Sequence, residues 1–141
     1  TRTTMSIDSW AIQAAFRSKL ITIPDIPSEL AWENRGYSPE TGSDGDPKPY
    51  IKESMIPGNE RLSANAETEQ VGIMQYDVYY PEGSGTKDAR KAADNIKNAF
   101  NATTTLSGLV RCDQPTVTRG DSDSPWYRLI VRVPYTVYGT L

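Results

Sequence analysis

Two stretches of the chain alternate between apolar and polar positions, which is the pattern of a strand with one buried face. The apolar face of the first, over residues 71–80, consists of Met74, Tyr76, Val78 and Tyr80. The apolar face of the second, over residues 126–138, consists of Tyr127, Leu129, Val131, Val133, Tyr135 and Val137. Arg128 and Arg132 lie on the polar face of the second stretch, where we expect them to meet solvent, carboxylates or another subunit.

Two other stretches have the apolar spacing of an amphipathic helix. The first, over about residues 6–20, places Ile12, Phe16 and Leu20 on one stripe and is followed by two prolines. The second runs from Thr86, a plausible N-cap, towards Phe100. Its stripe consists of Ala89, Ala92, Ala93, Ile96, Ala99 and Phe100. A stripe of such small residues predicts a helix that lies close against a sheet.

Shorter apolar runs predict three more strands, over residues 30–34, 50–56 and 109–118. Pro115 within the last run favours an edge strand or a bulge, because proline cannot donate a ladder hydrogen bond. The order of elements is helix, strands, helix, strands. It predicts an α+β fold, with an antiparallel or mixed sheet of about five strands and two helices packed on one face.

Three polar stretches separate these elements, over residues 35–49, 57–67 and 119–125. They are rich in Gly, Pro or acidic residues and predict long surface loops. The length of 141 residues is that of one ordinary domain. We therefore expect residues 1–141 to form a single domain with three long loops.

Composition and charge exclude several classes of function. No apolar run approaches the roughly 18–20 residues of a membrane helix, and residues 1–5 lead into no hydrophobic signal core, so we expect a soluble chain without a membrane partner. The net charge is −3 and the 15 basic residues are scattered. This argues against specific DNA binding, which relies on clustered Lys and Arg.

The chain contains no histidine and one cysteine, Cys112. Histidine is the commonest general base and metal ligand, so its absence argues against most catalytic triads and metal sites. A lone cysteine cannot form an internal disulfide, and its place inside a predicted strand indicates a small buried hydrophobe.

Two local patterns resemble binding motifs but do not complete them. Residues 83–87, Gly-Ser-Gly-Thr-Lys, lie between a strand and a helix but lack the glycine spacing of a phosphate loop. A calcium loop beginning at Asp44 or Asp121 would need a glutamate at its twelfth position, where Met55 and Arg132 stand. We expect a helix cap and solvated turns here, and no catalytic residue, cofactor or metal.

A series of short segments shares aromatic positions, order and spacing with a known family. After the amphipathic opening helix, the segments are residues 31–34 (AWEN), a Pro-Gly loop, residues 49–51 (PYI), residues 76–86 (YDVYYPEGSGT), the alanine-rich helix ending at Phe100, residues 126–129 (WYRL) and residues 133–135 (VPY). Together they span about residues 6–138 and resemble the phage tail terminator proteins.

The resemblance implies a structural subunit of the virion, assembled in the cytoplasm of a host bacterium. Such a subunit would form a homo-oligomeric ring, with six copies expected, that caps the tail tube protein and stops its polymerisation. The ring would also present a docking face for the head completion or connector protein. DNA would pass through its lumen without specific binding, and the acidic balance of the chain fits such a channel.

A closed ring needs two different patches on each subunit, and the tube and the connector need further faces. We expect these contacts to come from the three polar stretches and from the polar face of the last strand. The interface candidates are Arg35, Tyr37, Asp44, Asp46, Asn59, Glu60, Arg61, Leu62, Arg119, Asp121, Asp123, Arg128 and Arg132.

Three other functions remain open at this point. The nearest is another head–tail joining protein, such as a stopper, or a minor tail protein. A second is a small cytoplasmic enzyme that uses carboxylates in residues 35–49, since 18 acidic residues are available. A third is a monomeric binding module.

Overall fold

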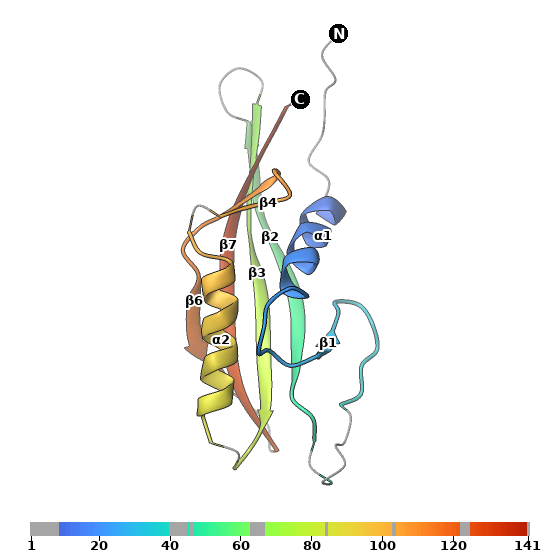
Figure 1. The fold of residues 1–141 in the computed structure, drawn as a ribbon. Helices are drawn as coiled ribbons and strands as arrows, with labels where there is room; N and C mark the ends of the chain where they lie inside the picture. Colours follow the sequence, from blue (N-terminus) through green and yellow to red (C-terminus); the bar gives the residue numbers. More distant parts are fainter. Residues whose placement is uncertain are drawn as a thin grey trace.

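A computed structural model of the protein describes residues 9–39, 45, 47–62, 67–83, 85–102, 104–121 and 125–140. Within these ranges the chain forms two helices and seven strands, arranged as Figure 1 shows. The helices are α1 (Ser9–Leu20) and α2 (Lys87–Ala99). The strands are β1 (Glu29–Ala31), β2 (Tyr50–Leu62), β3 (Glu67–Pro81), β4 (Thr105–Leu106), β5 (Val110–Cys112), β6 (Thr116–Arg119) and β7 (Trp126–Thr140).

The strands form one mixed sheet in the order β1-β2-β3-β7-β5-β4, and β6 pairs with β7 as well. β1 runs parallel to β2, and every other pair is antiparallel. The α+β class, the mixed sheet and the two helices are confirmed. The expected number of about five strands is wrong, since the described residues contain seven.

The extra strands have a local cause. The expected strand over residues 109–118 is divided into β5 and β6, because the chain leaves the ladder at residues 113–115. Pro115 has no N–H to donate there. β4 has only two residues, too few to give a period-two pattern.

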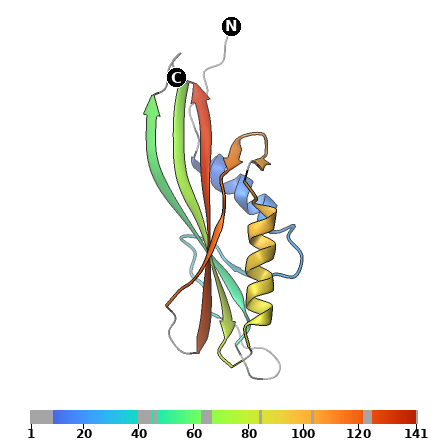
Figure 2. The ribbon, with the colours of Figure 1, turned by 90° about the vertical axis from the view of Figure 1, so that its left-hand side faces the viewer.

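The prediction of a loop over residues 57–67 is wrong. β2 continues through Pro57 to Leu62, with an irregular register between Pro57 and Glu60, and β3 begins at Glu67. Figure 2 shows that the ends of these strands reach beyond both helices. Because no helix faces this part of the hairpin, it carries polar residues on both faces, and the sequence alternation that marks a strand is lost.

Both helices cover the same face of the sheet (Figure 2), and the core lies between the two layers. The two predicted apolar stripes point into this core. Phe16 of α1 lies 5.4 Å from Phe100 and 5.6 Å from Tyr135 of β7, measured between ring centroids. Thr86 precedes α2 as expected, but its side chain makes no capping hydrogen bond.

A close approach within the sheet explains one glycine. Gly72 of β3 pairs with Tyr135 of β7, and a Cβ atom at position 72 would collide with the Tyr135 ring and hydroxyl. The missing side chain therefore makes room for a large buried aromatic, which covers the glycine backbone from the neighbouring strand.

We predict that Val131→Asp unfolds the subunit, whereas Arg132→Ala does not. Val131 is fully buried beneath the helices, so an unpaired carboxylate there should cost at least about 4 kcal/mol. Arg132 makes one hydrogen bond to Gln75 on the opposite face, and its loss should cost no more than about 2 kcal/mol. Urea denaturation followed by circular dichroism measures both. Equal losses would contradict this assignment of the two faces.

Candidate interface surfaces

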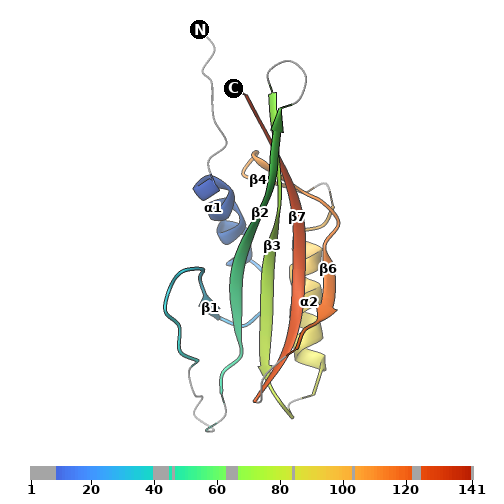
Figure 3. The same ribbon diagram turned by 180° about the vertical axis from the view of Figure 1, so that it is seen from behind.

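In the described part of the chain, no helix lies over the face of the sheet opposite α1 and α2 (Figure 3). Three cross-strand rows from β2, β3 and β7 lie on this helix-free face. The rows are Lys52–Asp77–Ile130, Ser54–Gln75–Arg132 and Ile56–Ile73–Pro134. The first two rows carry polar and charged groups, while the third is apolar, and 46% of the surface of Ile56 is exposed. Large apolar side chains exposed on a regular surface are typical of contact sites.

Three polar groups of these rows and the neighbouring Arg128 are linked across β3 and β7. Arg128 pairs with Asp77 at 2.9 Å, and Gln75 donates to the other Asp77 oxygen at 2.9 Å. Arg132 in turn donates to the Gln75 carbonyl at 3.1 Å. Arg128 has therefore met a carboxylate of its own chain, one of the outcomes expected for it. Among the described residues, Arg132 is bound only to a neutral amide, so its charge is not paired with a carboxylate there.

An aromatic cluster lies at one end of this face. Tyr50 stacks on Tyr79 at 4.6 Å, while Trp126 meets the Tyr50 ring edge-on at 5.1 Å and Tyr37 lies 4.9 Å away. Burial is the largest cause that raises the pKa of Tyr50 to about 12, so its hydroxyl stays neutral. Tyr37, an interface candidate, thus anchors its segment to the sheet by packing on Tyr50.

A buried ion pair joins α1 to β2, and sequence analysis missed it. Glu53 is 2% exposed and faces the helices. Arg17 donates to it through Nε at 3.1 Å and NH2 at 2.8 Å, and Gln13 donates at 3.0 Å. The guanidinium also lies over the rings of Trp32 and Trp10, at 4.7 and 5.3 Å from their centroids. Its hydrogen bond to Glu53 is the largest cause that raises the pKa of Arg17, so the guanidinium stays charged.

The sequence did contain a signal for this pair. Glu53 lies between Ile51 and Met55 in the inward phase of a predicted strand, where a charge needs a partner. Arg17 stands one residue after Phe16 in the first helix. Nothing in the sequence, however, determines which helix packs against which strand.

The outer edge of β2 is closed beyond the point where β1 ends. The Glu33 side chain accepts the outward-pointing N–H of Met55 at 2.7 Å. The next outward position on this edge, Pro57, has no N–H. A side-chain cap followed by proline is a device that blocks the addition of a further strand. Strand addition at positions 55 and 57 of β2 is therefore blocked.

The remaining candidates of the first two polar stretches are distributed as follows. Arg35 is exposed and lines a hollow of about 320 Å³ beside Tyr37 and Lys52. Asn59 is exposed on β2. Glu60, Arg61 and Leu62 also belong to β2, and Asp44 and Asp46 lie outside the described residues.

The candidates near residues 119–125 lie around the end of β6. Arg119 is exposed, with its guanidinium 5.7 Å from the centroid of the Tyr127 ring. It lines a hollow of about 560 Å³ together with Arg90 of α2. The Asp121 carbonyl accepts a hydrogen bond from Arg128 at 3.1 Å, and Asp123 lies outside the described residues.

Two results bear on chemical activity. Cys112 is buried, and this burial is the main cause that raises the pKa of its thiol to about 11, which keeps the thiol protonated at neutral pH. Within the described ranges, no three His, Cys, Asp or Glu side chains come together as a metal-binding group.

In the same part of the chain, no helix has the length and apolar composition that a membrane span requires.

We predict that Arg17→Met destabilises the fold by about 3 kcal/mol, because it leaves the Glu53 carboxylate buried without its cation. This value is at the low end of the range that is usual when one partner of a buried ion pair is removed, because the Arg17 side chain is 21% exposed to solvent. The double variant Arg17→Met/Glu53→Met should recover most of the loss, and Arg35→Met, which removes an exposed cation, should cost little. Chemical denaturation measures all three. A double variant as unstable as the single one would show that the unpaired charge is not the cause.

We predict that Cys112 does not react with a thiol reagent such as DTNB at pH 8 while the protein is folded. With a pKa of about 11, about one thiol in a thousand is ionised at that pH, and the side chain is buried. After unfolding in guanidinium chloride, one thiol per chain should react. Rapid reaction of the folded protein would instead indicate an accessible, activated cysteine.

Comparison with known proteins agrees with the fold and identifies the family. A solved structure of a protein without a functional name superposes with a TM-score of 0.66 at 21% sequence identity, covering 94% of this chain and 96% of the other. That likeness concerns the fold alone. No curated protein matches.

Residues 11–135 match the sequence profile of the phage tail terminator proteins, which are structural components of phage tails and not enzymes. Because the profile covers most of the chain, this protein belongs to the phage tail terminator family.

Proposed function

We propose that this protein forms a closed ring of identical copies that caps the tail tube, stops its polymerisation and provides the docking face for the head connector. Six copies are expected. The observation that carries the proposal is the two-layered subunit of a tail terminator family member, with helices on one side and a helix-free sheet face on the other.

Two unlike faces suit a ring. A ring is built by heterologous contacts, in which one patch of each subunit meets a different patch of the next, and the rotation closes. A single self-complementary patch, by which two subunits meet through the same surface, would form a twofold dimer instead. The helix layer and the helix-free face differ in shape and in chemistry, so they can serve as the two sides of such a contact.

The projecting ends of β2 and β3 offer a further surface. They extend past both helices (Figure 2), so they are available after the two faces of the subunit have been used. In the proposed ring this end contacts the tube or the connector. Asn59 is exposed in this part of β2 and would take part in the contact.

The closed edge of β2 fits a protein that ends an assembly. A sheet with an open edge offers its backbone groups to further strands and favours continued growth. Glu33 and Pro57 remove this possibility along β2. Growth of the tube would therefore halt at a ring whose own subunits do not recruit more chains by strand addition.

The net charge of −3 is compatible with DNA passing through the lumen. Tight contact with phosphates depends on clustered cations, which release the counterions of the DNA. Here Arg128 is neutralised by Asp77, and the cations at Arg90 and Arg119 lie at one corner of the subunit. We therefore expect DNA to pass without specific binding.

Deleting the gene from the phage provides the test. Without a cap, tubes should continue to polymerise, giving tails of irregular and excessive length that lack heads, and a plasmid copy should restore uniform tails. Electron microscopy of the particles measures the length distribution. Tails of normal, uniform length in the deletion would rule out the terminator role.

A further inference from the structure

The helix layer contains a shallow groove of about 660 Å³ between α2 and the segment that follows α1. The groove is lined by Asp25, Ile26, Pro27, Pro49, Tyr80, Asp88, Lys91 and Asn95. Asn95 donates to the Pro24 carbonyl at 3.1 Å, which holds the two walls together. Apolar side chains thus form part of the lining, and two carboxylates stand among them.

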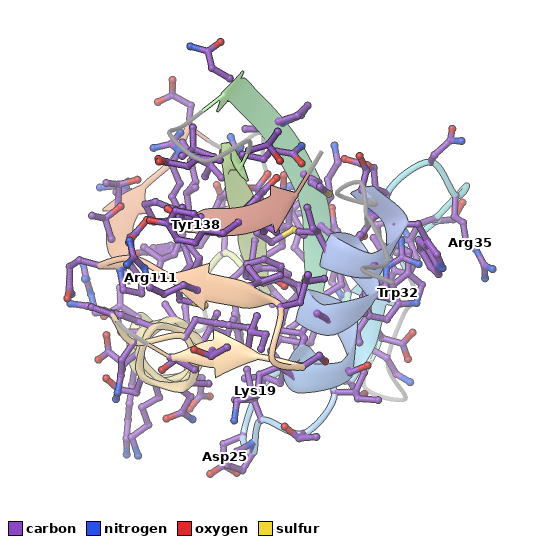
Figure 4. All side chains as sticks on the ribbon, turned by 90° about the horizontal axis from the view of Figure 1, so that it is seen from above. Lys19, Asp25, Trp32, Arg35, Arg111 and Tyr138 are labelled. Atoms are coloured by element: carbon purple, nitrogen blue, oxygen red, sulfur yellow. The ribbon has the colours of Figure 1, made fainter. Side chains whose placement is uncertain are left out.

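The carboxylates of this groove are exposed and face solvent. Figure 4 shows Asp25 projecting from the helix side of the molecule, away from the sheet. Neither Asp25 nor Asp88 forms an ion pair or hydrogen bond in the described part of the chain. Asp88 lies close enough to Tyr80 to contribute, after burial, to raising the pKa of that phenol. Lys91 also lines the groove, so its two carboxylates outnumber its cations by one. The groove is therefore partly apolar and carries a net negative charge.

The helix-free face has the complementary character. Lys52 is exposed there and has no carboxylate partner among the described residues, and Arg132 is bound only to the amide of Gln75. Beside them lies the apolar row that contains Ile56 and Ile73. This face is therefore apolar and basic, on the opposite side of the subunit from the groove.

The two surfaces lie at similar levels along the strands. Pro49 of the groove directly precedes β2, and Lys52 follows three residues later, roughly 10 Å along a strand. Patches at similar levels can meet with little rise along the strand direction. A small rise is a condition for closure into a ring, whereas a large rise would give an open helical filament.

We propose that the groove of one copy docks on the helix-free face of the next copy, with Asp25 and Asp88 opposite Lys52 and Arg132. This inference rests on the proposed ring and names the surfaces that close it. The occupant of each surface is a second copy because the same chain carries both members of the complementary pair. Strand addition at the β2 edge is not an alternative there, since Glu33 and Pro57 block it.

Two charge-reversed proteins test the docking. The first, Lys52→Glu/Arg132→Glu, makes both surfaces acidic, and the second, Asp25→Lys/Asp88→Lys, makes both basic. Asp94→Lys and Lys97→Glu serve as controls, because these residues lie on α2 outside the groove. Each protein is expressed from a plasmid in cells infected by the deletion phage, and circular dichroism establishes its folding. If the first is unfolded, Lys52→Glu alone replaces it.

Either reversed protein alone should fail to restore uniform tails, because like charges then meet at every contact. We expect the yield of normal tails to fall about a hundredfold or more, as for like charges placed across an interface. The two reversed proteins expressed together should restore normal tails, because each acidic surface then meets a basic one in an alternating ring. Native mass spectrometry of the released rings should show equal numbers of the two chains.

The docking would be overturned if one charge-reversed protein, folded and expressed alone, gave normal tails. It would also be overturned if the two charge-reversed proteins together failed to restore normal tails while both control proteins restored them. Pairs with twofold symmetry, in place of a ring, would also overturn it. Failure of the proposed function is distinguishable, because it appears as normal tails in the deletion phage that carries no plasmid.

Discussion

Two helices cover only one face of a seven-stranded sheet, and this limit determines how the molecule is organised. The covered face takes the large buried residues, such as Phe16, Tyr76 and Tyr135. The other face must satisfy its polar groups within the sheet or through another molecule. Arg128, Asp77 and Gln75 do so by bonding to one another. Lys52 has no carboxylate partner among the described residues, and Ile56 leaves apolar surface exposed. An uncovered face of this kind leaves a surface that a neighbour can use.

The ion pair between Arg17 and Glu53 ties α1 to β2. A buried carboxylate is tolerated only where its hydrogen bonds are satisfied, and three of the bonds to Glu53 come from Arg17. Because Glu53 also accepts from the Glu33 backbone at 3.3 Å, the same group positions the segment that caps the β2 edge. Helix docking and edge protection are thus parts of one hydrogen-bonded arrangement.

The function proposed here depends on shape and charge and not on reactivity. The buried thiol of Cys112 is protonated at neutral pH, and Glu53 is occupied by structural hydrogen bonds. What distinguishes the subunit is the contrast between its two sides. A partly apolar groove with a net negative charge lies in the helix layer, and an apolar, basic surface lies on the sheet. In the ring proposed for this member of the tail terminator family, the contrast serves assembly.

The sequence by itself determined the elements that have one buried and one polar side. The stripes of both helices and the inward faces of β3 and β7 follow from periodicity alone, because burial on one side forces alternation of residue types. The family was also recognisable from the order of its aromatic segments. The sequence did not reveal that β2 extends past residue 57, because a hairpin beyond the helices has no such alternation. It also did not reveal the residues that contact Glu53, Met55 or Gly72, because each contact depends on which element lies beside the residue. Only the tertiary structure brings together residues as distant as Arg17 and Glu53, since periodicity specifies which side of an element is buried but not what covers it.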